Sequence, residues 1–253
     1  MEPRRSGITI PGAIIIAAAI IAIALIYIFH PQHSATQSNN PLPQVSDATI
    51  RPVSASDHIL GNPSAPIKIV EYSDPSCPFC KMFNPTMVQI MDQYGPSGNV
   101  AWVYRDFPLD KPDENGNILH PNAGREAEAL ECAAIVGGND KFWAYEKKWY
   151  QDIPDDGAGR SQVEDMTQIQ KTATGIGLDA SAFSDCLSSG KAKDRVQKDY
   201  LDGRYAGISG TPYSIIITPS GSNVPLVGAQ PYPTVKAAID VLIPTIKGES
   251  TSR

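Results

Sequence analysis

This chain of 253 residues has little cysteine and little histidine, with four of each. Its cysteines are Cys77, Cys80, Cys132 and Cys186, and only the first two stand close together. A C-x-x-C pair is half of many zinc or copper sites, but here the second half is missing, because the other two cysteines are far apart and no histidine cluster accompanies them. We therefore expect no metal and no organic cofactor.

The chain also lacks an excess of basic residues. It has 21 Lys and Arg against 27 Asp and Glu, mixed along the sequence, with a formal net charge of −6. Nucleic-acid binding needs a basic face, so a nucleic-acid partner is not expected. The hydrophobic content of 42% is enough for an ordinary globular core. We find no internal repeat.

One long hydrophobic run stands out at residues 8–29, which contain no charged side chain and are rich in Ile and Ala. As a helix rising about 1.5 Å per residue, the run would span about 33 Å, the thickness of a bilayer core. A cleaved signal peptide is the alternative, but its apolar core is usually only about 7 to 15 residues long and ends at a small-x-small site. The run predicts an uncleaved transmembrane signal-anchor helix.

The flanks of this run predict its orientation. Arg4 and Arg5 precede it, and short positively charged flanks stay in the cytoplasm. Residues 1–7 are then a cytoplasmic N-terminus of a single-pass protein of the cell membrane, and everything after residue 30 is extracytoplasmic. Residues 30–56 are rich in Pro, Ser, Gln, Asn and Thr without apolar periodicity, which predicts a disordered linker.

A folded domain is predicted from 57 to 247, followed by a short tail at 248–253. Apolar runs and alternation predict strands, and apolar spacing of three to four predicts helices. A strand–helix–strand unit and a strand–strand–helix unit, separated by a helical insertion at about 120–206, are the layout of an α/β thioredoxin fold. The predicted strands are 67–73, 100–106, 213–218 and 224–227, and the predicted helices after the first are 122–136, 139–151, 161–174, 179–189, 191–206 and 232–246.

The motif Cys77-Pro78-Phe79-Cys80 lies where the first of these strands passes into a helix. Helix N-terminal N–H groups and the helix dipole stabilise a thiolate, so we expect Cys77 to be the nucleophile of a redox-active disulfide. Cys80, one turn further on, would resolve the mixed disulfide. The alternative is a permanent structural disulfide, although such a tight loop gains little from a cross-link.

Three segments together resemble the DsbA-like thiol–disulfide oxidoreductases, in particular their membrane-tethered branch. They are residues 69–80, residues 127–134 followed by Lys141-Phe142-Trp143, and Gly210-Thr211-Pro212. The resemblance covers about 57–247. It implies a cis bond before Pro212, a loop that offers backbone groups to an extended substrate, and a Thr211 hydroxyl that tunes the thiolate. Pro212 could also simply begin a strand in trans.

Two further features concern a carboxylate and the remaining cysteines. The family carries an acid at the position of Glu71, and a buried carboxylate there would have a raised pKa and relay protons for Cys80, unless it is solvated at a sheet edge. Relatives of the tethered branch have a structural disulfide of the kind that would join Cys132 and Cys186. Two buried free thiols are the alternative.

The sequence thus predicts an extracytoplasmic oxidoreductase that forms disulfides in secreted proteins. Its expected substrates are reduced, unfolded secreted polypeptides, and the resemblance implies a membrane reoxidase that passes electrons to a quinone. A reductase or isomerase of the same fold is an alternative, which the redox potential would distinguish. A second alternative is a non-enzymatic anchored binding or chaperone domain with a structural disulfide. Such a protein should lose only stability on Cys77→Ser.

Overall fold

A computed structural model describes residues 50–113, 115–153, 166–221 and 223–250. The predicted cytoplasmic N-terminus, the predicted transmembrane helix at 8–29 and the predicted linker up to residue 49 lie outside the described residues. No helix in the described ranges has the length and hydropathy needed to cross a membrane.

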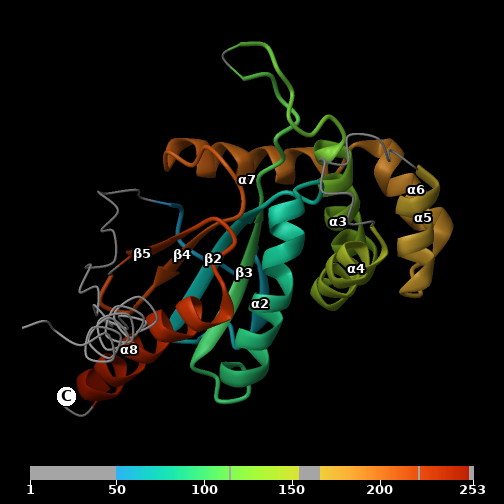
Figure 1. The fold of residues 1–253 in the computed structure, drawn as a ribbon. Coiled ribbons are helices and arrows are strands. Elements are labelled where there is room, and N and C mark those ends of the chain that lie inside the picture. The colour runs from blue at the N-terminus through green and yellow to red at the C-terminus, as the bar shows by residue number, and fades with distance from the viewer. Residues whose placement is uncertain (1–49, 114, 154–165, 222, 251–253) are drawn as a thin grey trace, which may run out of the picture. The chain divides into compact units, whose positions relative to one another are not determined.

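The described domain is built on a sheet of five strands in the order β1-β3-β2-β4-β5 (Figure 1). The central pair, β2 and β3, is parallel, and the other neighbours are antiparallel. A parallel pair needs a crossover, which the helix α2 (Pro78–Tyr94) supplies. The strands are β1 (His58–Gly61), β2 (Ile67–Ser73), β3 (Val100–Asp106), β4 (Tyr213–Ile217) and β5 (Asn223–Val227).

Alternate residues of β2 pack on opposite faces of the sheet, as the two-residue period of a strand requires. Ile67 and Ile69 join the core beneath α2 and α8 (Tyr232–Ser250). Val70 and Tyr72 belong to a second apolar cluster, on the face that α7 (Lys193–Tyr205) covers. Position 71 of β2 therefore points to the α2 face, the face on which the Cys-x-x-C motif lies.

The helical insertion lies between β3 and β4 and gathers beside the sheet (Figure 1). A disulfide between Cys132 and Cys186, with an S–S distance of 2.05 Å, joins α3 to α6. The pair of free thiols considered as an alternative is therefore excluded for these residues. Besides α7, the insertion consists of α3 (Ala123–Gly137), α4 (Asn139–Asp152), α5 (Met166–Gly175) and α6 (Ala180–Ser189).

The beginning of the domain differs from the prediction in two ways. The strand β1 pairs antiparallel with β3 at the sheet edge and was not predicted, because four residues are too few to show alternation. The end of the predicted linker, residues 50–56, is not a free tether. Ile50 is buried, and the Arg51 guanidinium lies 2.5 Å from the Asp199 carboxylate and 2.9 Å from that of Asp57.

The final helix also runs further than the sequence pattern predicts. We expected it to end near residue 246 and a tail to begin at 248, but α8 continues to Ser250. Pro244 lies inside this helix without ending it. The first three residues of the predicted tail, 248–250, are therefore helical.

Candidate active site

The two cysteines of the Cys-x-x-C motif lie at the N-terminus of α2, as expected. Cys77 is the N-cap residue and Pro78 occupies the first helical position, where its missing N–H costs no hydrogen bond. Both cysteines are free thiols in this structure, so the pair is in its reduced form. Cys77 is 3% exposed and Cys80 is fully buried. The Cys77 sulfur is thus the one nearer to solvent.

The loop before β4 meets this sulfur. The Thr211–Pro212 peptide bond is cis, and the Cys77 thiol donates to the Thr211 carbonyl oxygen at 3.5 Å. The buried Thr211 hydroxyl has no hydrogen-bond partner among the described residues, which leaves it free to donate to a Cys77 thiolate. The structure therefore brings together Cys77, Cys80, Thr211 and Pro212, although half of the domain separates the two pairs in sequence.

The environment of Cys77 favours its thiolate. The pKa of Cys77 falls to about 6, mainly because the Cys80 thiol hydrogen-bonds to the thiolate. Burial opposes the fall, whereas the Thr211 hydroxyl and the Cys80 backbone N–H add to it. A Cys77 thiolate is therefore the dominant form of this residue at neutral pH.

Cys80 behaves in the opposite way. Burial raises its pKa well above the usual range, and the negative charge on Cys77 raises it further. The Asp74 backbone N–H lies 3.4 Å from the Cys80 sulfur. One proton is thus shared unequally by two adjacent sulfurs, with Cys77, the one nearer to solvent, ionised and Cys80 protonated. A nucleophile paired with a resolving thiol requires this asymmetry.

Glu71 lies on the α2 face of β2 and is only 2% exposed. The Trp102 indole N–H donates to its carboxylate at 2.9 Å. Burial raises the pKa of Glu71 to about 7. The alternative considered from the sequence, a solvated glutamate at a sheet edge, is therefore wrong. The buried Glu71 carboxyl group gains or loses its proton near neutral pH.

One group of this site was not predicted from the sequence, a buried pair formed by Asp74 and His120. The His120 Nδ1 atom lies 2.8 Å from an Asp74 carboxylate oxygen. The Cys77 backbone N–H donates to the Asp74 carbonyl oxygen at 3.0 Å, so the pair adjoins the nucleophile. A signal was present, because the ends of parallel strands meet at one sheet edge and the loops after β2 and β3 carry Asp74 and His120.

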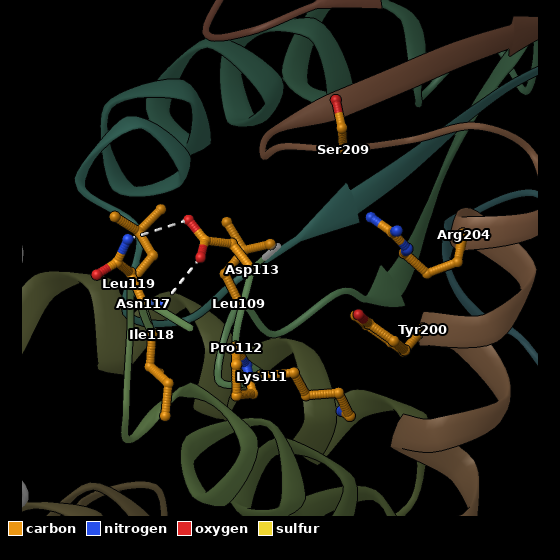
Figure 2. Close-up of a pocket in the computed structure, with 10 residues that line it drawn as sticks. All are labelled: Leu109, Lys111, Pro112, Asp113, Asn117, Ile118, Leu119, Tyr200, Arg204 and Ser209. Atoms are coloured by element: carbon orange, nitrogen blue, oxygen red, sulfur yellow. Dashed lines mark hydrogen bonds between the residues drawn. The ribbon is translucent and has the colours of Figure 1, made fainter. Parts of the chain in front are cut away.

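A cavity of about 620 Å³ opens beside this site, between the loop after β3 and α7 (Figure 2). The Lys111 ammonium lies 4.1 Å from the centre of the Tyr200 ring on α7. Two of the lining residues connect the cavity to the cysteines. Leu109 donates its backbone N–H to Asp74 at 2.9 Å, and Ser209 precedes Thr211 by two positions. The cavity is lined by Leu109, Lys111, Pro112, Asp113, Asn117, Ile118, Leu119, Tyr200, Arg204 and Ser209.

A second group of buried carboxylates lies away from the cysteines. Asp106, Glu131 and Asp199 place one carboxylate oxygen each within 4.8 Å of the others, a spacing that could hold a cation. Basic side chains already meet two of them, because His58 lies 2.8 Å from Glu131 and Arg195 lies 3.4 Å from Asp199. We therefore attribute the placement of Glu131 and Asp199 to their ion pairs with His58 and Arg195.

Comparison with known proteins gives a family for most of the chain. A family model described as thioredoxin matches residues 54–240. DsbA2 of Pseudomonas aeruginosa, a solved structure, is 26% identical with a TM-score of 0.58, and the alignment covers 76% of this chain and 97% of DsbA2. The solved α-DsbA1 of Wolbachia pipientis, at 22% identity and a TM-score of 0.65, covers 78% of this chain and 96% of its own and supports the fold alone.

A curated relative is a longer protein. The Na(+)/H(+) antiporter NhaA 1 of Mycolicibacterium gilvum is 28% identical over 202 residues, which are 78% of this chain. The chain spans only 29% of the length of that relative. The match thus concerns only a part of the antiporter, whereas the name of the antiporter refers to the whole longer protein.

Proposed function

Since this chain belongs to the thioredoxin family, we propose that it is a DsbA-like protein thiol–disulfide oxidoreductase that works through Cys77 and Cys80. The observation that carries the proposal is the unequal pair of sulfurs at the start of α2. Cys77 has a pKa of about 6 and Cys80 a pKa raised well above its usual range. Thiol–disulfide exchange proceeds by attack of a thiolate and is faster when the leaving sulfur has a low pKa, so Cys77 suits both the attacking and the leaving position.

The exchange balances with the residues present. A substrate thiolate attacks the Cys77 sulfur of the Cys77–Cys80 disulfide, which forms a mixed disulfide and releases Cys80 as a thiolate. Glu71, with a pKa of about 7, is placed to supply the proton that Cys80 then takes up. A second substrate thiolate attacks the substrate sulfur and releases the Cys77 thiolate. Two substrate thiols become one disulfide, and the enzyme disulfide becomes the reduced pair.

The proposed direction of exchange is supported by the redox state that the protein stabilises. A Cys77 thiolate that is stabilised in the reduced form makes the reduced form easier to reach, so the disulfide form is an oxidant. We therefore assign the role of disulfide formation in secreted proteins rather than reduction or isomerisation.

The surface around Cys77 suits an extended polypeptide. Phe79 and Met82, in the first turns of α2, are 57% and 64% exposed, so two apolar side chains border the Cys-x-x-C motif at the surface. Leu119, on the rim of the neighbouring cavity, is 65% exposed. Reduced, unfolded polypeptides expose apolar side chains, so we assign them as substrates.

We extend the proposal to location and partners. The apolar run at 8–29, with Arg4 and Arg5 before it, is assigned as a single-pass anchor that leaves the catalytic domain outside the cytoplasm. A membrane reoxidase that delivers electrons to a quinone would regenerate the disulfide. Alkaline phosphatase fused after residue 253 should be active in intact cells. An inactive fusion, with a cytoplasmic reporter active in its place, would contradict this topology.

The proposed activity is tested on the full chain in mild detergent. Equilibration of Cys77 and Cys80 with glutathione should give a potential of about −120 to −180 mV, whereas about −270 mV would indicate a reductant. Cys77→Ser should abolish oxidation of a reduced, unfolded protein, and Cys80→Ser should accumulate mixed disulfides with it. A pair that resists glutathione, together with full binding of unfolded chains by Cys77→Ser, would favour the binding-domain alternative.

A further inference from the structure

The active-site motif supplies no positive charge of its own. Phe79, between the cysteines, is apolar and points into solvent with 57% of its surface exposed. The buried imidazole of His120, from the loop after β3, lies instead against Asp74, whose backbone N–H is 3.4 Å from the Cys80 sulfur and whose carbonyl oxygen accepts from the Cys77 N–H. We propose that His120, held in its charged form by Asp74, is the positioning residue that stabilises the Cys77 thiolate. This inference rests on the function proposed above.

The Asp74 carboxylate is arranged as an ion. It is fully buried and accepts from the backbone N–H groups of Ser76 at 2.7 Å and Leu109 at 2.9 Å, one at each oxygen, and the His120 Nδ1 atom lies 2.8 Å from the second oxygen. Two backbone donors that reach both oxygens favour the ionised carboxylate, which only accepts hydrogen bonds. A buried anion of this kind requires a cation beside it, and His120 is the side chain that meets it.

The charge state of His120 follows from its neighbours. Burial alone would lower the pKa of His120, but the hydrogen bond and the charge of Asp74 outweigh burial and raise it. The charges of Cys77 and Glu126 raise it further. These groups face the imidazole from three elements, namely the loop after β2, the start of α2 and α3. Glu126 also accepts from the Ser76 hydroxyl at 2.5 Å, which ties α3 to the same loop.

The effect on Cys77 follows by reciprocity. If ionisation of Cys77 raises the pKa of His120, protonation of His120 must lower the pKa of Cys77 by the same free energy. The negative charge of Asp74 acts in the other direction and raises the pKa of Cys77. His120 therefore stabilises the thiolate directly and also balances the anion beside it. Loss of its proton removes both effects.

The consequence is an oxidant whose strength depends on pH. A charged His120 stabilises the reduced form over the disulfide form, so its contribution is complete below the His120 pKa of the disulfide form and disappears as the pH rises through the His120 pKa of the reduced form. Above that pH the reduced form loses its stabilising cation. The disulfide form is then a weaker oxidant than it is below that pH.

The test replaces His120 in the full chain and titrates Cys77 directly. In His120→Gln the ultraviolet absorbance of the thiolate should appear at higher pH than in the wild type. The equilibrium with glutathione at neutral pH should move about tenfold toward the disulfide, since one pKa unit is tenfold. His58→Gln is the matched control, because His58 is also buried and lies 2.8 Å from a carboxylate, that of Glu131 on α3. Its thiolate titration should equal that of the wild type.

A second measurement needs no substitution. The NMR titration of the His120 ring in the wild type should give a higher pKa in the reduced protein than in the oxidised one, because only the reduced protein carries the thiolate. Equal His120 pKa values in the two redox states, or an unchanged thiolate titration in a folded His120→Gln, would overturn the inference. Normal exchange by the wild type in those cases leaves the proposed function intact, whereas a wild type that exchanges no disulfide with glutathione refutes the function itself.

Discussion

Cys77 and Thr211 lie 134 positions apart in the sequence, and the thiol of the first donates to the carbonyl oxygen of the second at 3.5 Å. The contact joins the start of α2 to the loop before β4. The hydroxyl of the same Thr211 is buried and without a hydrogen-bond partner among the described residues. This hydroxyl can therefore donate a hydrogen bond to the Cys77 sulfur once that sulfur is a thiolate.

Removing that hydroxyl should weaken the thiolate. Thr211→Val keeps the shape of the side chain but removes the donor that lowers the pKa of Cys77, so this pKa should rise by up to about one unit, a tenfold change in thiolate at acidic pH. The rate of alkylation of Cys77 against pH measures it. Thr211→Ser, which keeps the hydroxyl, is the control. Identical profiles for the Val and Ser variants would exclude a role for the hydroxyl.

Cys80 should matter more for the thiolate than Thr211 does. Its thiol hydrogen bond is the largest cause of the lowered pKa of Cys77, which is about 6. Wild-type Cys77 should therefore be alkylated at a rate that rises through about pH 6. In Cys80→Ala the rise should move toward the pKa of a free cysteine, about 8.5. In Cys80→Ser, which keeps a donor, the rise should lie between the two. The reverse order of Ala and Ser would contradict this explanation.

Glu71 should control how fast Cys80 resolves a mixed disulfide. Cys80 is buried and protonated, so it needs a base, and Glu71 becomes one as the pH rises through about 7. In the wild type the rate of resolution should rise through that pH. In Glu71→Gln it should be about 100-fold lower, the lower limit of general-base effects. Rapid mixing of a preformed mixed disulfide measures the rate. Glu128→Gln, which removes a carboxylate paired with Arg125 at the helix surface, should resolve at the wild-type rate.

The parts of this protein that could be predicted from its sequence are those that depend on neighbouring residues. The strands at 67–73 and 100–106 have the predicted bounds because β-branched and aromatic residues mark the first and alternation of apolar and polar residues marks the second. The Cys-x-x-C motif is likewise local, and its place at a helix start follows from the pattern before and after it. The same is true of the helical insertion, whose apolar spacing marks each helix.

What could not be predicted depends on pairs that meet only in the fold. Asp74 and His120 are 46 positions apart, and although the loops after parallel strands meet at one sheet edge, nothing in the sequence shows that these two side chains pair there. The same limit explains the linker. The composition of residues 30–56 indicates disorder, but Arg51 is fixed by Asp199, a residue 148 positions away. A short, polar segment can be ordered by ion pairs that composition does not reveal.

The Cys132–Cys186 disulfide should contribute stability without affecting the active site. It closes a loop of 54 positions, for which the chain-entropy relation gives about 4 kcal/mol. The double variant Cys132→Ala/Cys186→Ala should lose about that much free energy of unfolding in urea. Its alkylation profile for Cys77 should match the wild type, because Cys132 lies six positions beyond Glu126, the residue of α3 that reaches the active-site loop. A changed profile in the folded variant would show that the insertion positions the thiolate.

Arg51 should anchor the start of the domain. Its side chain is 17% exposed, whereas its partner Asp199 is fully buried, so removing the cation leaves a buried carboxylate without its closest ion pair. Breaking such a pair typically costs about 3–5 kcal/mol. Arg51→Ala should therefore lower the midpoint of urea unfolding strongly.

A matched arginine shows whether this loss is specific. Arg125 lies 3.7 Å from Glu128 on α3, but its side chain is 42% exposed, and ion pairs at such positions contribute about 1 kcal/mol or less. Arg125→Ala should unfold close to the wild-type midpoint. If Arg51→Ala and Arg125→Ala both unfold at the urea midpoint of the wild type, residues 50–56 add no more to the stability of the domain than a flexible tether would. If Arg51→Ala alone is destabilised, the folded domain begins before Asp57, because the ion pair of Arg51 with Asp199 is then part of its stability.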